Sequence, residues 1–362
     1  MGAKEKKLTW LYKSIKDPIK IDSQKDRYVF FSDQHIGMPE FDRNKQLYLK
    51  ALDYYYEAGF TLVVLGDFEE LHRYGIKKIK RRYNDVYASE RRFLFEKRYY
   101  RIYGNHDIDW RSPRRVKKHL HEVMPGLTVY EALRFDWEGN NIFLAHGHQG
   151  DFLNDTLGIV GRIVLRCLAR PLDISSLTSP AKRYTKRRKD EEKFYIWAKK
   201  HKILFIAGHT HRPMFESLTK GDRIRIDIEN NLRKYVQSTN EQAKQNIEQQ
   251  IKKLKKDFDE HVQEEGKKNW SSGFGGPELV IPCYSNDGSC LHRSGITCIE
   301  LEKRRIRLVF VYDESISANT EKYLRAPTIP LVPADPKASM YKKQILEDED
   351  LDYIFTRIRF LS

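Results

Sequence analysis

The chain has 362 residues, 40% of them hydrophobic, which is enough to bury a substantial core. Its 66 lysines and arginines exceed its 51 aspartates and glutamates and give a formal net charge of +15. An excess of this size favours anionic partners, such as nucleic acid, phosphorylated small molecules or anionic membrane surfaces. No apolar stretch approaches the length of a membrane-spanning helix, which excludes a protein built on such helices.

The first residues contain no apolar signal core, so we expect a cytoplasmic protein that touches a membrane at most from the side. The four cysteines follow no zinc-site spacing and no dense disulfide pattern, which indicates buried, reduced thiols. They are Cys167, Cys283, Cys290 and Cys298.

Short runs of β-branched and aromatic residues predict a series of strands. The first five, each followed by a polar cluster, are residues 27–31, 61–65, 99–103, 141–145 and 203–207. A helical pattern at 42–57 lies between the first two, and further strands are expected at 279–284, 296–301 and 305–312. The alternation predicts an α/β protein of stacked sheets flanked by helices.

We expect residues 1–312 to form one catalytic domain with two insertions, followed by a C-terminal extension at 313–362. The insertion at 151–202 begins with apolar residues at helical spacing and with Arg162 and Arg166 on the opposite face, which predicts a basic amphipathic lid. The charged insertion at 219–276 predicts a long helix or helical hairpin that could pair with another chain, and Ser238 with Glu241 fits a capping box.

Two stretches concentrate the positive charge. Residues 77–101 carry a net charge of +7, and residues 162–202 carry +9. Solvated helical faces and specific anion-binding surfaces both remain open as interpretations.

The polar clusters after the five strands contain the residue types of a metal site. The candidate ligands are Asp33, His35, Asp67, Asn105, His146, His209 and His211. Asp33 and His35, like His209 and His211, stand at i and i+2, so each pair leaves an extended backbone on one face. Oxygen and imidazole ligands without thiolate favour two divalent ions among manganese, iron and zinc. Asp67 could bridge both ions.

His106, beside Asp107, has the character of an imidazole whose proton state is set by a carboxylate. We therefore predict His106 and Asp107 as catalytic residues, His106 assisting the leaving oxygen. His148 has no ligand role in this scheme and is expected to be structural or to support the ligands.

The ordered series Asp33-x-His35, Gly66-Asp67-x-x-Glu70, Gly104-Asn105-His106-Asp107, His146 and Gly208-His209-x-His211 resembles the calcineurin-like metallophosphoesterase family. The resemblance implies a four-layered α/β/β/α sandwich with helical insertions. It also implies one metal held by Asp33, His35, Asp67 and His211, and another held by Asp67, Asn105, His146 and His209.

The ending Gly208 to Pro213 and the insertion after His146 are similar to the UDP-2,3-diacylglucosamine pyrophosphatase branch, although those enzymes usually carry Arg where His106 stands. The resemblance implies metal-activated hydroxide attack on a phosphodiester or pyrophosphate bond, in which the substrate could be a nucleotide-linked lipid. Two alternatives stay open: a metal-dependent DNA or RNA nuclease, and a non-enzymatic binding scaffold.

Overall fold

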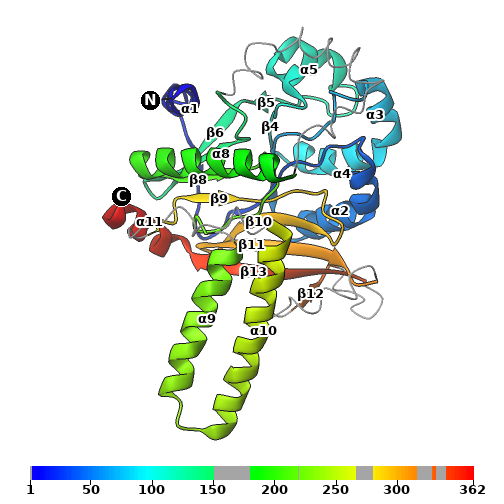
Figure 1. Ribbon diagram of the computed structural model, residues 1–362. Helices are drawn as coiled ribbons and strands as arrows, with labels where there is room; N and C mark the ends of the chain where they lie inside the picture. The colour runs from blue at the N-terminus through cyan, green and yellow to red at the C-terminus, as the bar shows by residue number, and fades with distance from the viewer. Residues whose placement is uncertain (1, 151–179, 219, 266–279, 316–327, 332–339) are drawn as a thin grey trace.

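The computed structural model describes residues 2–150, 180–218, 220–265, 280–315, 328–331 and 340–362. Two β-sheets lie at its centre, and helices cover their outer faces (Figure 1). One sheet contains, in spatial order, β12 (Thr328–Pro330), β13 (Tyr341–Asp350), β11 (Arg305–Asp313), β10 (Ile296–Glu302), β2 (Arg27–Phe31), β3 (Thr61–Leu65), β4 (Tyr99–Ile102) and β5 (Val129–Tyr130). The other contains β1 (Ile19–Ile21), β6 (Ala132–Trp137), β7 (Asn140–Ala145), β8 (Leu204–Ala207) and β9 (Tyr284–Asn286).

The eight-stranded sheet is buried on both faces. Phe30 of β2 belongs to the core between the two sheets, whereas Val29 and Phe31 belong to the core under the helices. Successive side chains of a strand point to opposite faces, so one apolar run supplies both cores. The helices on this outer side include α2 (Pro39–Glu57) and α4 (Asn84–Phe95).

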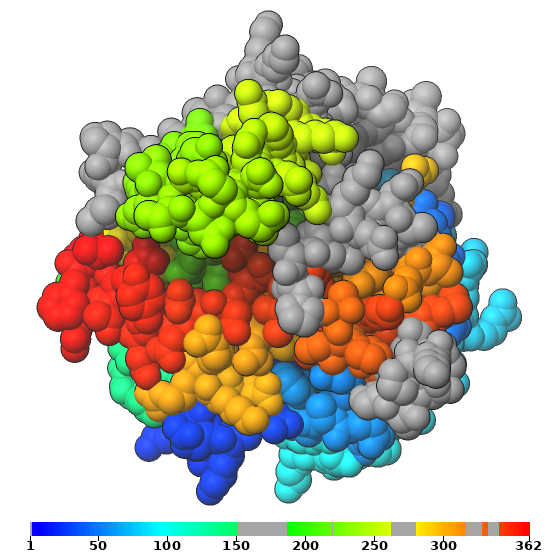
Figure 2. All heavy atoms as spheres, turned by 90° about the horizontal axis from the view of Figure 1, so that it is seen from below, coloured from blue at the N-terminus to red at the C-terminus, as the bar shows by residue number. Residues whose placement is uncertain are grey.

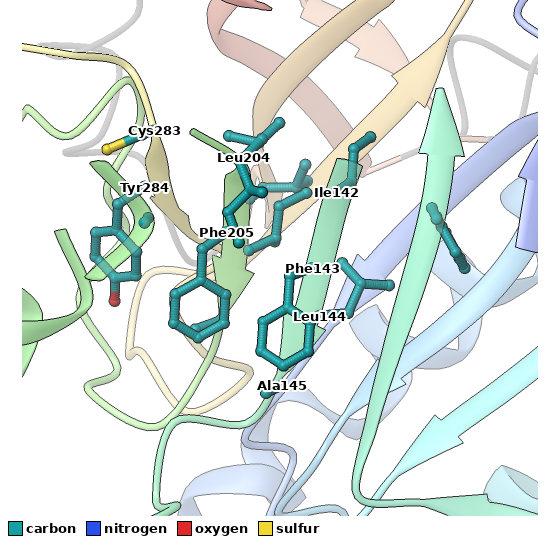
Figure 3. Close-up of a cluster of buried hydrophobic side chains, with 14 of the residues drawn as sticks. Ile142, Phe143, Leu144, Ala145, Leu204, Phe205, Cys283 and Tyr284 are labelled. Carbon is teal, nitrogen blue, oxygen red and sulfur yellow. The ribbon is translucent and has the colours of Figure 1, made fainter. Parts of the chain in front are cut away.

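The helices α1 (Ala3–Ser14) and α8 (Pro180–His201) cover the outer face of the five-stranded sheet. The rings of Phe143 on β7 and Phe205 on β8 lie side by side, with centroids 5.5 Å apart (Figure 3). Trp197 of α8 packs against Phe143 at 5.3 Å and Phe205 at 5.6 Å. The fold is therefore a four-layered α/β/β/α sandwich, as the family resemblance implies.

Both sheets contain a run of parallel strands. β2, β3 and β4 are parallel neighbours in one sheet, and β7, β8 and β9 are parallel neighbours in the other. The carboxyl ends of parallel strands meet at one edge of a sheet, so the loops after these strands gather at the same end of the sandwich. Three short helices lie within the connections after β3 and β4: α3 (Ile76–Arg82), the 3-10 helix η1 (Ile108–Arg111) and α5 (Pro113–His119).

The first five predicted strands are confirmed within one residue at each end. The strand predicted at 279–284 is wrong, because β9 covers only Tyr284–Asn286. Pro282 has no backbone N–H to give to a ladder, and the N–H of Cys283 turns back to the carbonyl of Ile281 at 2.8 Å. The carbonyl of Cys283 accepts from the N–H of Phe205 on β8 at 2.8 Å, so pairing with β8 begins only at the end of the predicted run.

The second insertion forms a helical hairpin. Its helices α9 (Lys220–Gln237) and α10 (Glu241–Glu265) pack on one another and project from the sandwich (Figure 1), and Figure 2 shows the hairpin from its far end. The predicted capping box at Ser238 is wrong: Asn240 precedes α10, and its Oδ1 accepts from the N–H of Ala243 at 3.0 Å. The amphipathic pattern predicted after residue 151 lies outside the described residues.

The predicted C-terminal extension contributes to the sandwich. β13 pairs with β11 along nearly its whole length, and the helix α11 (Leu351–Leu361) buries Leu351, Ile354 and Ile358 in the core between the layers. The expected boundary at residue 312 therefore falls inside a continuous sheet. None of the described helices combines the length and hydropathy that crossing a bilayer requires.

Candidate metal centre

Two groups of predicted ligands converge at the loop end of the sandwich. Ligand atoms of Asp33, His35 and His211 lie within 4.8 Å of one another, and so do those of Asp67, His146 and His209. The first group joins the loops after β2 and β8, and the second joins the loops after β3, β7 and β8. Strands from both sheets thus bring together residues as far apart as 33 and 211.

Asp67 lies between the two groups. Its Oδ2 is 3.2 Å from His146 Nε2 and 3.6 Å from His35 Nε2. Its Oδ1 accepts from the backbone N–H of His106 at 2.7 Å. One carboxylate oxygen is thus anchored to a loop, and the other is presented to both groups.

The backbone of these loops takes a conformation that L-residues adopt infrequently. Five predicted ligands have φ in the left-handed region, from +46° to +71°. They are Asp33, His35, Asp67, His209 and His211. Such conformations cost free energy and persist where the surrounding structure imposes them, and they concentrate at functional sites.

Close backbone approach at the centre requires glycine at residue 104. A Cβ there would lie 2.1 Å from Asp67 Oδ1 and 2.5 Å from Asp67 N. The glycine that precedes Asn105 therefore lets the loop after β4 contact the loop after β3.

The predicted ligands fit a cation chemically. Four of their buried atoms have no hydrogen-bond partner among the described residues: Asp33 Oδ1, His35 Nε2, Asn105 Oδ1 and His146 Nε2. Leaving buried polar atoms unsatisfied costs free energy, whereas divalent cations bind carboxylate, amide and imidazole donors of this kind. The Nδ1 of His146 lies 2.8 Å from the carbonyl oxygen of Leu65, an arrangement that leaves Nε2 for a metal.

The electrostatics of the centre favour positive charge. Burial opposes ionisation of Asp67, but His146 and His106 outweigh it and hold the pKa of this carboxyl well below its usual range. Burial likewise opposes charge on His146, but Asp67 and Asp33 raise the pKa of its ring to about 9. A cation at this position would take the place of that proton.

The carboxylate beside His106 is Glu70 and not Asp107. Glu70 Oε2 lies 2.8 Å from His106 Nδ1 and 3.0 Å from His35 Nδ1. Burial opposes ionisation of Glu70, but hydrogen bonding by His106 and His35 holds the pKa of its carboxyl well below its usual range. Glu70 stands in the motif Gly66-Asp67-x-x-Glu70, and no role was predicted for it from the sequence.

The expectation that Asp107 supports His106 is therefore corrected. Asp107 is fully buried and accepts from the N–H of Gly104 at 2.6 Å and the N–H of Phe68 at 3.0 Å. His106 and Asp107 lie in the turn before η1, where the side chain of His106 faces Glu70 and that of Asp107 faces the backbone of Gly104 and Phe68. Asp107 ties the loop after β4 to the loop after β3.

A buried arginine, Arg101, pairs with the carboxylates behind the metal centre. It was not predicted from the sequence. Its guanidinium is fully buried on β4, contacts Glu69 and lies 3.3 Å from Asp107. Glu69 also accepts from Tyr87 at 2.7 Å and from Trp110 at 2.9 Å. The position of Arg101 inside an apolar strand run could have signalled a buried ion pair.

Two further histidines border the centre. The ring of His72 packs on the ring of His106 with centroids 4.4 Å apart, and both are partly exposed. His148 is buried, with its ring 5.5 Å from that of His146, and it belongs to neither ligand group. Its role as a structural residue or a support for the ligands stays a prediction.

A two-sheet α/β sandwich with clustered Asp and His at its loop edge defines the class of metal-dependent phosphoesterases. The profile of the calcineurin-like phosphoesterase family matches residues 27–213, and the chain belongs to this family. It is a metal-dependent phosphoric ester hydrolase. Among curated proteins, none matches the chain.

Proposed function

We propose that this chain hydrolyses a phosphodiester or pyrophosphate bond with two divalent ions, manganese, iron or zinc. One ion would be held by Asp33, His35, Asp67 and His211, and the other by Asp67, Asn105, His146 and His209. The main support for this assignment is the position of Asp67 Oδ2 between the two ligand groups. It lies 3.6 Å from His35 Nε2 and 3.2 Å from His146 Nε2. Two bound cations would lower the pKa of a water for attack on phosphorus and neutralise charge on the phosphoryl oxygens.

We assign His106 as the group that gives a proton to the leaving oxygen. Its side chain is 30% exposed, whereas His35 and Asp67 are nearly inaccessible, so His106 can reach a bound substrate. Its Nε2 lies 4.0 Å from Asp67 Oδ2, at the border of the ligand groups. Because Glu70 contacts Nδ1, Nε2 is the nitrogen left to face the substrate.

Basic segments that closely follow His72 and His106 in the sequence support a substrate with more than one phosphate charge. The helix α3 begins four residues after His72, and η1 begins two residues after His106. Residues 76–82 and 111–119 together contain ten lysines and arginines and no aspartate or glutamate. A second phosphate group, as in a pyrophosphate, would find cations near the scissile one.

A substrate panel with manganese tests this function. The wild type is expected to turn over bis-p-nitrophenyl phosphate or a UDP-linked lipid faster than p-nitrophenyl phosphate, and Asp67→Asn is expected to abolish turnover. Turnover confined to the monoester would contradict the proposed bond type. The UDP-lipid arm also tests whether a nucleotide-linked lipid is the substrate.

A metal-dependent nuclease is the second candidate, and the basic helices favour it. Lys80 of α3 contacts Glu122, which follows α5. Burial lowers the pKa of His119 on α5, and Lys118, Arg115 and Lys80 lower it further. Lys80 thus lies close to both segments, which form one surface. Within the described residues, this surface presents no exposed large hydrophobic side chain that would enter a membrane. An extended phosphate backbone fits it better than a lipid surface does.

Binding of a fluorescent single-stranded oligonucleotide at 50 and 200 mM salt separates the two candidates. A nuclease is expected to lose affinity steeply with salt, and substituting Lys77, Lys78 and Arg81 by glutamine should flatten the slope. The matched control replaces Lys252, Lys253 and Lys256 of the hairpin. Salt-independent binding, or equal effects of both triple variants, would contradict the nuclease.

A further inference from the structure

A buried carboxyl outside the matched family region reaches the metal centre. Asp287 follows β9, and β9 pairs in parallel with β8, with Asn286 opposite Ala207. Asp287 therefore emerges at the same sheet edge as His209, which follows β8. Its N–H donates to the carbonyl of Ala207 at 3.3 Å.

Ser32 connects Asp287 to Asp33. The hydroxyl oxygen of Ser32 lies 2.6 Å from Asp287 Oδ1 and 2.6 Å from Asp33 Oδ2. All three residues are fully buried. No solvent therefore competes for these hydrogen bonds, which are stronger in such surroundings than at a surface.

The number of protons available limits which group donates each hydrogen bond between Asp287, Ser32 and Asp33. A hydroxyl carries one proton, so Ser32 donates to only one of the two carboxyls. Asp33, which lies 3.0 Å from His211 Nε2, is the better acceptor because it bears the charge. The second hydrogen bond is then donated by the carboxyl of Asp287 to the Ser32 oxygen, and burial favours this neutral acid.

These hydrogen bonds fix the orientation of the Asp33 carboxylate. Its Oδ2 accepts from Ser32 and from the N–H of His209 at 2.8 Å. Its Oδ1 has no hydrogen-bond partner among the described residues and faces His211 and His35. Anchoring one oxygen in this way leaves the other in a fixed direction for a ligand bond.

Residue 208 must be small for this contact to exist. A Cβ on Gly208 would lie 2.4 Å from Ser32 Oγ and 2.8 Å from Asp33 Oδ2. The adjoining Asn286 also holds the loop, since its side-chain amide donates to the carbonyl of Gly208 at 2.6 Å. The segment after β9 is thus built against the loops that carry Asp33 and His209.

We propose that Asp287 is a positioning residue of the metal centre, which acts through the Ser32 hydroxyl to present Asp33 Oδ1 to a cation. This inference rests on the proposed role of Asp33 as a metal ligand. It extends the centre to a residue far beyond the matched region 27–213.

Calorimetric titration of the full-length, chelator-stripped protein with Mn²⁺ tests the proposal. Ser32→Ala and Asp287→Ala are expected to weaken Mn²⁺ binding about 10- to 100-fold. Asp287→Asn is expected to stay within about threefold of wild type, because its amide can still donate to Ser32. Urea unfolding in chelator reports the stability of each metal-free variant separately.

Glu300→Gln is the matched control for general damage to the core. Glu300 is a buried carboxylate that contacts Tyr55 and Lys343 and none of the predicted ligands. It is expected to lower stability without weakening Mn²⁺ binding. Equal Mn²⁺ affinity of wild type, Ser32→Ala and Asp287→Ala would overturn the proposal, and so would an equal loss in Glu300→Gln or in Asp287→Asn.

The same titration distinguishes failure of the proposed function from failure of the positioning role of Asp287. Wild type that binds no Mn²⁺, Fe²⁺ or Zn²⁺ overturns the proposed function and this proposal together. Wild type that binds metal with unchanged affinity in the Ser32 and Asp287 variants overturns the positioning role alone.

Discussion

The Nδ1 of His106 lies 2.8 Å from the Oε2 of Glu70. The same carboxylate oxygen accepts a hydrogen bond from His35 at 3.0 Å, so one side chain orients a proposed metal ligand and the proposed proton donor. This relationship links metal binding and proton transfer at the proposed active site.

Glu70→Gln should lower kcat about 10- to 100-fold, as is usual when a residue that orients a metal ligand is changed. If Glu70 also orients the proton donor, the loss should be larger for alkyl esters, whose alkoxide is a poor leaving group and needs a proton, than for p-nitrophenyl esters. Steady-state kinetics across a leaving-group series measures this. Glu122→Gln, at an exposed carboxylate, is the control, and a loss independent of the leaving group would refute the link to His106.

Metal should stabilise the fold, because the proposed ligands come from loops of both sheets. A ligand that binds only the folded state at one hundred times its Kd adds about 2.7 kcal/mol to the free energy of unfolding. Thermal unfolding in chelator and in excess Mn²⁺ should show a higher Tm with metal. Asp67→Asn should erase most of the difference, and an equal shift in that variant would argue against Asp67 as the shared ligand.

Arg101→Met should cost about 3 kcal/mol of unfolding free energy, because it leaves Glu69 and Asp107 buried without their cation. Arg82→Met, which breaks an ion pair in which the arginine side chain is 57% exposed, should cost less than about 1 kcal/mol. Urea unfolding of both variants provides the comparison. Similar losses in the two would show that the buried pair contributes no more than a surface one.

Glu90 should make stability depend on pH. Burial raises the pKa of its carboxyl from 4.5 to about 7, even though Tyr99 and Tyr48 donate to it. The unfolded chain therefore loses this proton first, so the free energy of unfolding falls as pH rises from about 4.5 to about 7. The full effect is at most about 3 kcal/mol.

Glu90→Gln removes this titration, so the stability of the variant relative to wild type should increase between pH 5 and pH 8. Urea unfolding of both proteins at the two pH values measures the difference, in which the other titrating groups cancel. A difference that stays constant or decreases would contradict the raised pKa.

The sequence by itself determined the five strands that carry the predicted ligands and the residue types of the centre. Apolar runs such as 27–31 and 61–65 are local patterns, and the polar residues that follow each run are local too. Asp33, Asp67 and His146 could therefore be named as candidate ligands from these patterns, although they meet across two sheets. The helical hairpin could also be predicted, since helical periodicity is a property of neighbouring residues.

Only the tertiary structure decided which side chains support those residues. Glu70 contacts His106 where the sequence favoured Asp107, because the direction of a side chain in a loop depends on the backbone of that loop. Ser32 and Asp287 meet across 255 residues because β9 pairs with β8, and strand order leaves no local signal in the sequence. Long-range pairing, which depends on the packing of the whole chain, thus determined the surroundings of a centre whose proposed ligands were already visible in the sequence.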